Sequence, residues 1–181
     1  TDVVIGPELR KLAKRSGGKV RAEVWDATGV LGELARGWRS LTCAQVEALF
    51  ARCDPGVPPS GEPDLVVSAN CISQIGIVPV DRFPGAGADE TFQDRCGAAA
   101  ARRHRQWLAA RPGVRVLLGA RARLDIAPDG RELRREPVPG MESMRKPDRT
   151  WRWLLAPIPE WCPDFDRVHE VGAWIDGPGR R

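Results

Sequence analysis

The stretch from Pro63 to Pro79 constrains the fold more than any other part of the chain. The apolar run at 65–67 has no alternation, which is typical of a strand whose two faces are both covered by helices. Small and polar residues follow at 68–70, where an open α/β sheet places its ligand crevice. We therefore predict a parallel-sheet domain built around this strand, with its chemistry at the strand's carboxyl end.

Length and composition bound the class of protein. With 181 residues, 42% of them hydrophobic and 29% charged, the chain has the size and make-up of one globular domain. No apolar run approaches the roughly 20 residues that a membrane span needs. The five cysteines are widely spaced without a Cys-x-x-Cys pair, which argues against a disulfide framework and a zinc site. We therefore expect a cytoplasmic protein without a metal centre or membrane contact.

The net charge of +4 conceals an asymmetry along the chain. The region Arg102–Arg152 has 14 basic and 6 acidic residues, so it is strongly basic while the remainder is acidic. A basic region can attract nucleic acid or an acidic partner. The alternative is a solvated arginine-rich surface, which the scarcity of interleaved aromatic residues favours.

Two strand–helix units are expected before the central strand. Residues 2–5 predict the end of a strand, 7–16 a helix and 20–25 a second strand. Thr42 and Gln45 form a capping box that predicts the start of the next helix. Strand–helix repetition of this kind is typical of a parallel sheet with right-handed crossovers.

After the central strand we expect a long helix at about 89–110, a strand at 114–118 and a tight turn at Asp129-Gly130. Two late strands, 151–156 and 168–175, are joined by a segment without helical periodicity, which predicts an antiparallel pair at the sheet edge. The expected fold class is α/β. It is a Rossmann-like, mostly parallel sheet with helices on both faces and an antiparallel C-terminal strand pair.

In two segments the sequence resembles the class I S-adenosylmethionine-dependent methyltransferases. Asp64-Leu-Val-Val-Ser-Ala-Asn-Cys-Ile-Ser-Gln-Ile75 looks like the family's fourth strand and its following turn. Trp107-Leu-Ala-Ala-Arg-Pro-Gly-Val-Arg-Val-Leu-Leu118 looks like the family's helix end, Pro-Gly turn and fifth strand. The resemblance covers nearly the whole chain. It implies S-adenosylmethionine as the cofactor and methyl transfer to an acceptor that the residues do not identify.

The resemblance also implies cofactor contacts at five positions. Asp2 matches the acidic residue that holds the ribose hydroxyls, and Asp26, with the Ala27 backbone beside it, matches the one that faces the adenine amino group. Ser68 and Asn70 lie where the loop after the fourth strand borders the methyl group and its acceptor. Each aspartate or asparagine has a structural alternative: Asp2 as a solvated terminal residue, Asp26 as a turn former and Asn70 as a cap of the following turn.

The chain departs from the family at its start. The family's first strand and glycine-rich loop would precede Asp2, and no Gly-x-Gly-x-Gly run occurs elsewhere. We therefore expect residues 1–181 to be a single methyltransferase-like domain from a longer enzyme, or a methyltransferase-like protein that performs no methyl transfer.

Two other functions stay open. A non-catalytic binding module would use Arg102–Arg152 for nucleic acid or an acidic partner, and a nucleotide-dependent oxidoreductase would need the same absent glycine loop. His104 shares an apolar stripe with Cys96 and is expected to be a packed helix residue, while His169 receives no role. Four C-terminal tryptophans are expected to cover the core or the sheet edge rather than to stack on bases: Trp151, Trp153, Trp161 and Trp174.

Overall fold

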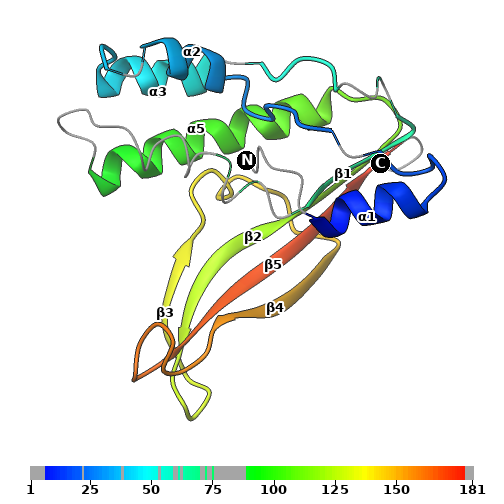
Figure 1. The fold of residues 1–181 in the computed structure, drawn as a ribbon. Helices are drawn as coiled ribbons and strands as arrows, with labels where there is room; N and C mark the ends of the chain where they lie inside the picture. The colour runs from blue at the N-terminus through cyan, green and yellow to red at the C-terminus, as the bar shows by residue number, and fades with distance from the viewer. Residues whose placement is uncertain are drawn as a thin grey trace.

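The strands of the protein form one curled, mixed sheet in a computed structural model (Figure 1). The structure describes residues 7–21, 23–37, 39–52, 54–58, 61, 63–69, 72, 75 and 89–177. The sheet order is β1-β2-β5-β4, and β3 pairs with the far half of β2. The strands are Leu65–Ala69 (β1), Val114–Ile126 (β2), Glu132–Pro137 (β3), Arg149–Ala156 (β4) and Asp166–Asp176 (β5).

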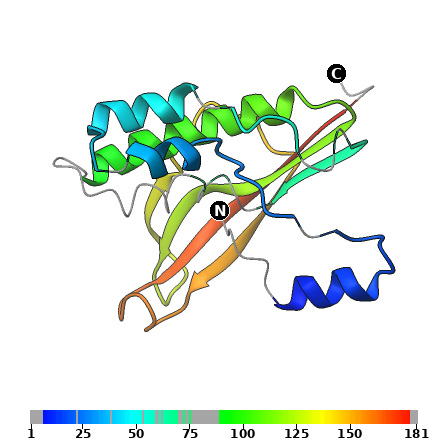
Figure 2. The ribbon, with the colours of Figure 1, turned by 45° about the horizontal axis from the view of Figure 1, so that its top comes forward.

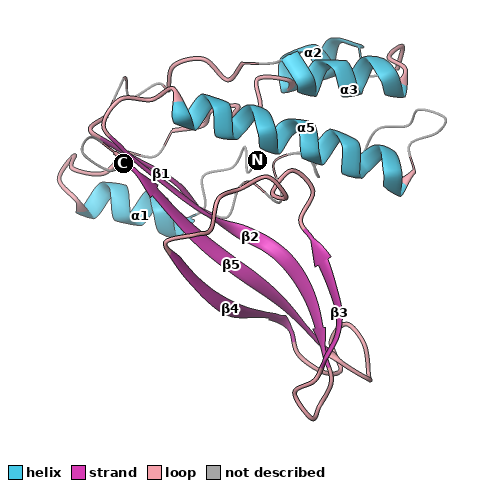
Figure 3. Cartoon of the chain, turned by 180° about the vertical axis from the view of Figure 1, so that it is seen from behind, coloured by secondary structure: helices cyan, strands magenta, loops and turns pink. Residues whose placement is uncertain are grey.

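The predicted Rossmann-like, mostly parallel sheet with helices on both faces is wrong. Among the described strands, β1 and β2 form the one parallel pair, whereas β2·β3, β2·β5 and β4·β5 are antiparallel. The sheet curls along its length into half a barrel (Figure 3). The last two strands do pair antiparallel with β4 at the edge, but β1, expected at the centre, lies at the other end of the described order.

The length of β2 explains much of this difference. The sequence predicts a strand that ends at Leu118, but β2 continues to Ile126 and the chain then reverses at Asp129-Gly130. Gly130 has φ +85°, a left-handed conformation that glycine adopts without steric penalty. So short a turn can join only antiparallel strands, because a parallel connection needs a dozen or more residues. In addition, residues 20, 21 and 23–25 form no strand, although the alternation over 20–25 predicted one.

The described helices are Pro7–Arg15 (α1), Leu31–Gly37 (α2), Cys43–Arg52 (α3) and Glu90–Ala109 (α5). The last three form layers on one side of the sheet. α5 runs along the sheet, and α2 and α3 stack on the side of α5 that faces away from the sheet (Figures 1 and 2). α1 stands apart from these three helices, and its Leu12 is exposed. No helix within the described residues is long and apolar enough to cross a bilayer.

Side-chain caps start the two principal helices where the sequence predicts them. Thr42 N donates to Gln45 Oε1 at 2.8 Å and Gln45 N donates to Thr42 Oγ1 at 3.3 Å, which is the expected capping box. The Asp89 carboxylate accepts from Phe92 N at 2.8 Å and caps α5. These bonds satisfy backbone donors that have no partner inside the helix.

Apolar clusters form on two sides of α5. On one side, fully buried Phe50 and Phe92 pack with residues of α2 and α3. On the other side, Trp107 and Leu108 of α5 pack with Leu117 of β2 and Trp174 of β5. Because α5 contributes to both clusters, it joins the helical layers to the sheet. This packing also holds in place the α5 side chains that face β1.

Candidate functional site

Asp26 closes the loop that leads into α2. Its Oδ1 accepts hydrogen bonds from the backbone N and the hydroxyl of Thr28, and its Oδ2 accepts from Leu31 N at 2.8 Å. The side chain of Thr28 is buried, and its oxygen accepts from Val30 N at 3.2 Å. The Asp26 carboxylate therefore stabilises the loop and the first turn of α2, which is the turn-forming alternative that the sequence raises.

Ser68 meets a histidine of α5. The Ser68 hydroxyl and His104 Nε2 are 2.7 Å apart and share a hydrogen bond, and both side chains are buried, 7% and 4% exposed. The His104 ring stacks on Trp107 with 5.5 Å between the ring centroids. Trp107 in turn lies 5.1 Å from Trp25, which precedes the Asp26 loop. The expectation that His104 is a packed helix residue is confirmed.

Burial lowers the pKa of His104 to about 4, because the charged imidazolium would lose its hydration. The backbone of Ala27 approaches the same ring and opposes this shift. The contact falls short of hydrogen-bond geometry, and Nδ1 is buried without a hydrogen-bond partner. The imidazole is therefore neutral at pH 7. Two of the five predicted cofactor residues, Ala27 and Ser68, thus meet at one ring.

A serine hydroxyl beside an imidazole is also the arrangement of a nucleophile and its base. Such a base is oriented by a third group, whereas Nδ1 of His104 has no hydrogen-bond partner. Both Ser68 and His104 are also closed off from solvent. The geometry therefore favours a structural pair that ties β1 to α5 over a hydrolytic one.

Asp2 and Asn70, the remaining predicted cofactor residues, lie outside the described residues. Their assignments to the ribose hydroxyls and to the reacting centre stay predictions. The structure describes the other three predicted positions. Ala27 and Ser68 both approach His104, and the Asp26 carboxylate is hydrogen-bonded within its own loop and to the first residue of α2.

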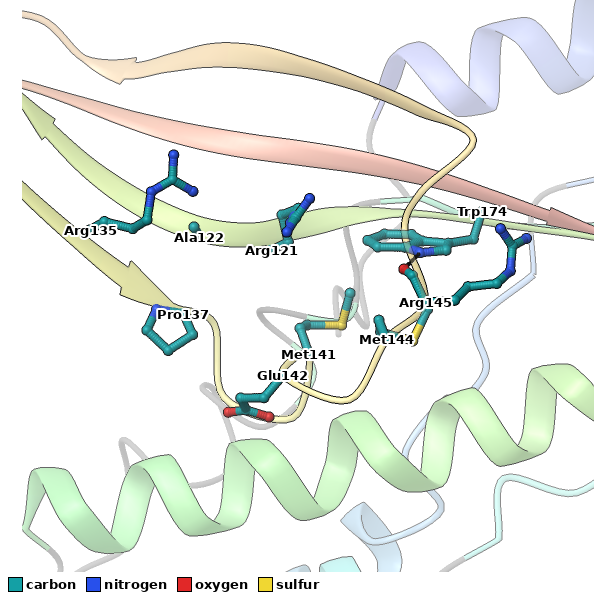
Figure 4. A pocket seen from close by; sticks show the side chains of 9 residues that line it. All are labelled: Arg121, Ala122, Arg135, Pro137, Met141, Glu142, Met144, Arg145 and Trp174. Atoms are coloured by element: carbon teal, nitrogen blue, oxygen red, sulfur yellow. Dashed lines mark hydrogen bonds between the residues drawn. The ribbon is translucent and has the colours of Figure 1, made fainter. Parts of the chain in front are cut away.

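A cavity of about 420 Å³ opens beside β2 and the segment that follows β3 (Figure 4). One part of its wall is apolar, formed by Met141, Met144 and the ring of Trp174. The Trp174 indole donates to the Arg145 carbonyl at 2.8 Å, so the ring is held in place. The full lining is Arg121, Ala122, Arg135, Pro137, Met141, Glu142, Met144, Arg145 and Trp174.

The arginines of this cavity belong to an ion-pair network. Arg121 and Arg135 both contact Glu170, at 3.3 and 3.2 Å, and Arg135 also pairs with Glu132 at 2.8 Å. The hydrogen bond to Arg135 lowers the pKa of Glu132 below its usual range. Carboxylates of β3 and β5 thus fix the directions of these guanidinium groups.

A second cavity of about 420 Å³ shares Arg121 with the first and lies at the start of β4. Its wall includes the basic residues Lys146 and Arg149 together with Asp148 and Glu170. Both cavities fall within the basic region Arg102–Arg152 or beside it. Five basic residues of this region line the two cavities, together with Glu142, Asp148 and Glu170: Arg121, Arg135, Arg145, Lys146 and Arg149.

Among the described residues, no group of three or more histidine, cysteine, aspartate or glutamate side chains is arranged to hold a metal ion. No family model matches the chain, and neither the curated proteins nor the solved structures contain a match. The resemblance to methyltransferases and the cofactor that it implies therefore stay predictions.

The arginine-lined cavity was not predicted from the sequence. Arg121, Arg135, Arg145 and Trp174 come from β2, β3, a connecting segment and β5. They become neighbours through the antiparallel pairing of β2 with β3 and β5. The sequence predicted the turn at Asp129-Gly130, but it paired 168–175 with 151–156 and not with β2. The basic excess between Arg102 and Arg152 was the available signal, but it does not specify which arginines meet.

Proposed function

We propose that the chain serves S-adenosylmethionine-dependent methyl transfer, with the cofactor held near the carboxyl end of β1. The observation that supports this is the convergence of Ala27 and Ser68 on His104. Both residues match cofactor positions in the family that the sequence resembles, and they lie far apart along the chain. The cytoplasmic location expected from the cysteines belongs to the same proposal.

Methyl transfer from S-adenosylmethionine requires few catalytic side chains. The sulfonium of the donor is already activated, so catalysis comes mainly from holding the methyl group and the acceptor at close range. A general base is needed only when the acceptor must lose a proton. Ser68 and neutral His104 act here as positioning residues that fix the carboxyl end of β1 against α5.

The Asp26 carboxylate can contribute to adenosine binding while it holds its loop. Ionised carboxylates offer about four lone-pair sites. Backbone and hydroxyl donors of Thr28 and Leu31 occupy three of them. The side chain is partly exposed, so a ligand at the surface of this loop can meet the remaining site.

The test is direct binding of S-adenosylmethionine and S-adenosylhomocysteine to the full chain, measured by titration calorimetry. Asp26→Asn should weaken binding by about tenfold, because a charge-assisted hydrogen bond becomes a neutral one. Asp89→Asn is the matched control, since Asp89 also caps a helix with its carboxylate. It should lower the melting temperature to a similar extent and leave the cofactor affinity unchanged. Equal affinities in both variants would refute the Asp26 assignment.

A second candidate function is a non-catalytic module that binds nucleic acid or an acidic partner through its basic region. The observation in its favour is the gathering of Arg121, Arg135, Arg145, Lys146 and Arg149 around two adjoining cavities. An oxidoreductase gains no comparable support.

Salt separates the two candidates. Binding to a polyanion releases counterions, so its affinity should fall about linearly on a log–log plot as salt rises. Affinity for the small cofactor should change little over the same range. The chain should be titrated with a fluorescent oligonucleotide and with S-adenosylmethionine between about 50 and 200 mM salt. A salt-independent oligonucleotide affinity would contradict the binding module.

A further inference from the structure

Strand β4 exposes an aromatic and basic surface at the free edge of the described sheet. Trp151 and Trp153 are 43% and 47% exposed, and Arg149 and Arg152 are exposed as well. The alternation of a strand places Arg149, Trp151 and Trp153 on one face. Their partners on β5 are Ala173, Val171 and His169. Arg152 lies opposite Glu170 on the other face, 3.8 Å from Glu132. We call the three residues Arg149, Trp151 and Trp153 the β4 surface.

Both tryptophans can serve as stacking platforms. An indole buried in a core would show little accessible area, yet each of these rings leaves more than two fifths of the residue exposed. Residues two apart on a strand are separated by about 7 Å. That spacing allows two successive bases of an extended single strand to stack, one on each ring.

The charged residues on and beside β4 indicate which kind of ligand it would bind. β4 carries two arginines and no acidic residue. Arg149 is the arginine of β4 that shares the face of the tryptophans. The cavity at the start of β4 adds Lys146 and Arg121, beside Asp148 and Glu170. Cationic side chains next to exposed aromatic rings match a chain that alternates phosphates with flat bases.

Two other occupants fit less well. Pairing the β4 strands of two copies would bring four arginines close together without an acidic residue on either strand to balance them. An acidic protein would satisfy the arginines but would have no base to lay on the tryptophans. A single-stranded nucleic acid satisfies both the charge and the rings.

We propose that the β4 surface binds single-stranded nucleic acid, with bases stacked on Trp151 and Trp153 and a phosphate held by Arg149. This inference rests on the second candidate function and names its ligand. The contact is independent of sequence, because every base has a face on which an indole can stack.

The experiment is a fluorescence titration of the full chain with oligothymidylate of about 15 nucleotides, the scale of a single-strand binding site. Stacking should quench tryptophan emission. Trp151→Ala/Trp153→Ala should weaken binding by about 30-fold or more, while affinity for heparin, a polyanion without bases, should stay within about twofold. Trp161→Ala is the matched control, since Trp161 is 64% exposed but lies outside β4. It should leave the oligonucleotide affinity unchanged.

Further variants keep the test valid if the double alanine variant folds poorly. Trp151→Phe/Trp153→Phe retains flat rings and should keep most of the affinity. Arg149→Gln should reduce the salt slope by about 0.7, the value for one phosphate contact on a single strand.

Each contrary outcome has a distinct meaning. If the wild-type chain binds oligothymidylate but the double alanine variant binds equally well, the β4 surface is refuted and the binding module stands. If the wild-type chain binds neither oligothymidylate nor heparin, both are refuted. If sedimentation shows a dimer that the double variant abolishes, the surface is a contact between copies and the inference is wrong.

Discussion

Replacing Trp174 with alanine should destabilise the fold by about 3 to 5 kcal/mol, the usual range for removing a buried aromatic ring. Trp174 is 2% exposed and packs in the cluster that joins β2 and β5 to α5. Its indole also donates to the Arg145 carbonyl, so the variant leaves that carbonyl without its partner. The change is large against the 5 to 15 kcal/mol that stabilises a typical domain. Urea unfolding followed by circular dichroism measures it.

Two variants calibrate this result. Trp161→Ala removes an exposed ring that lies 4.7 Å from the Arg167 guanidinium, and it should destabilise by less than about 1 kcal/mol. Gly172→Ala tests the packing of the Trp174 ring by adding a side chain against it instead of removing the ring. A Cβ at residue 172 would lie 2.5 Å from the Trp174 ring, so overpacking should cost about 1 to 3 kcal/mol. A Trp174→Ala effect no larger than that of Trp161→Ala would refute the core role.

Acidification from pH 7 to 5 should destabilise the protein by about 2 kcal/mol through His104 alone. The ordinary histidine pKa of 6.5 applies to the unfolded chain, whereas burial lowers the value in the fold to about 4. Between these values the unfolded state binds a proton that the folded state does not, so stability falls as the pH falls through this window. Each pH unit inside it corresponds to about 1.4 kcal/mol. Urea unfolding at several pH values measures the slope.

The matched variant is His104→Gln, which should remove this part of the slope between pH 6.5 and 5. Carboxylate titrations are common to both proteins and cancel in the comparison. His169→Gln is the second control. Burial, together with Arg123 and Arg167, lowers the pKa of the half-buried His169. Its removal should flatten the slope in the same direction but by less. Parallel slopes for wild type and His104→Gln would show that the imidazole is not buried in its neutral form.

Local signals predicted three of the four described helices and the hairpin. Capping at Thr42 and the turn at Asp129-Gly130 act over a few residues, and both form as expected. The architecture was not predictable in the same way, because a strand's partner depends on chain far away in sequence. The apolar run at 65–67 predicted a strand correctly but not its place at the end of the described order, where Leu65 is 53% exposed.

In the candidate site, too, some features could be predicted from the sequence and others could not. The resemblance placed Ala27 and Ser68 near one cofactor, and the structure brings both to His104. The sequence could not reveal that the Asp26 carboxylate would be engaged by Leu31 N, because α2 itself was not predicted. The edge position of β4 was predicted, but the exposure of Trp151 and Trp153 was not, because these rings were expected to cover the core or the sheet edge.

The central place of β2 in the sheet determines which strands should unfold locally first. This strand pairs with β1, β3 and β5, whereas β1, β3 and β4 each pair with one described strand. Amide protons exchange with solvent only when their hydrogen bonds break, and the slowest ones report the last cooperative unit to unfold. The amides in the middle of β2 and β5 should therefore exchange most slowly. The edge strand β4 should release its protons earlier, which leaves the proposed nucleic-acid surface on the part of the sheet that can open without unfolding the rest.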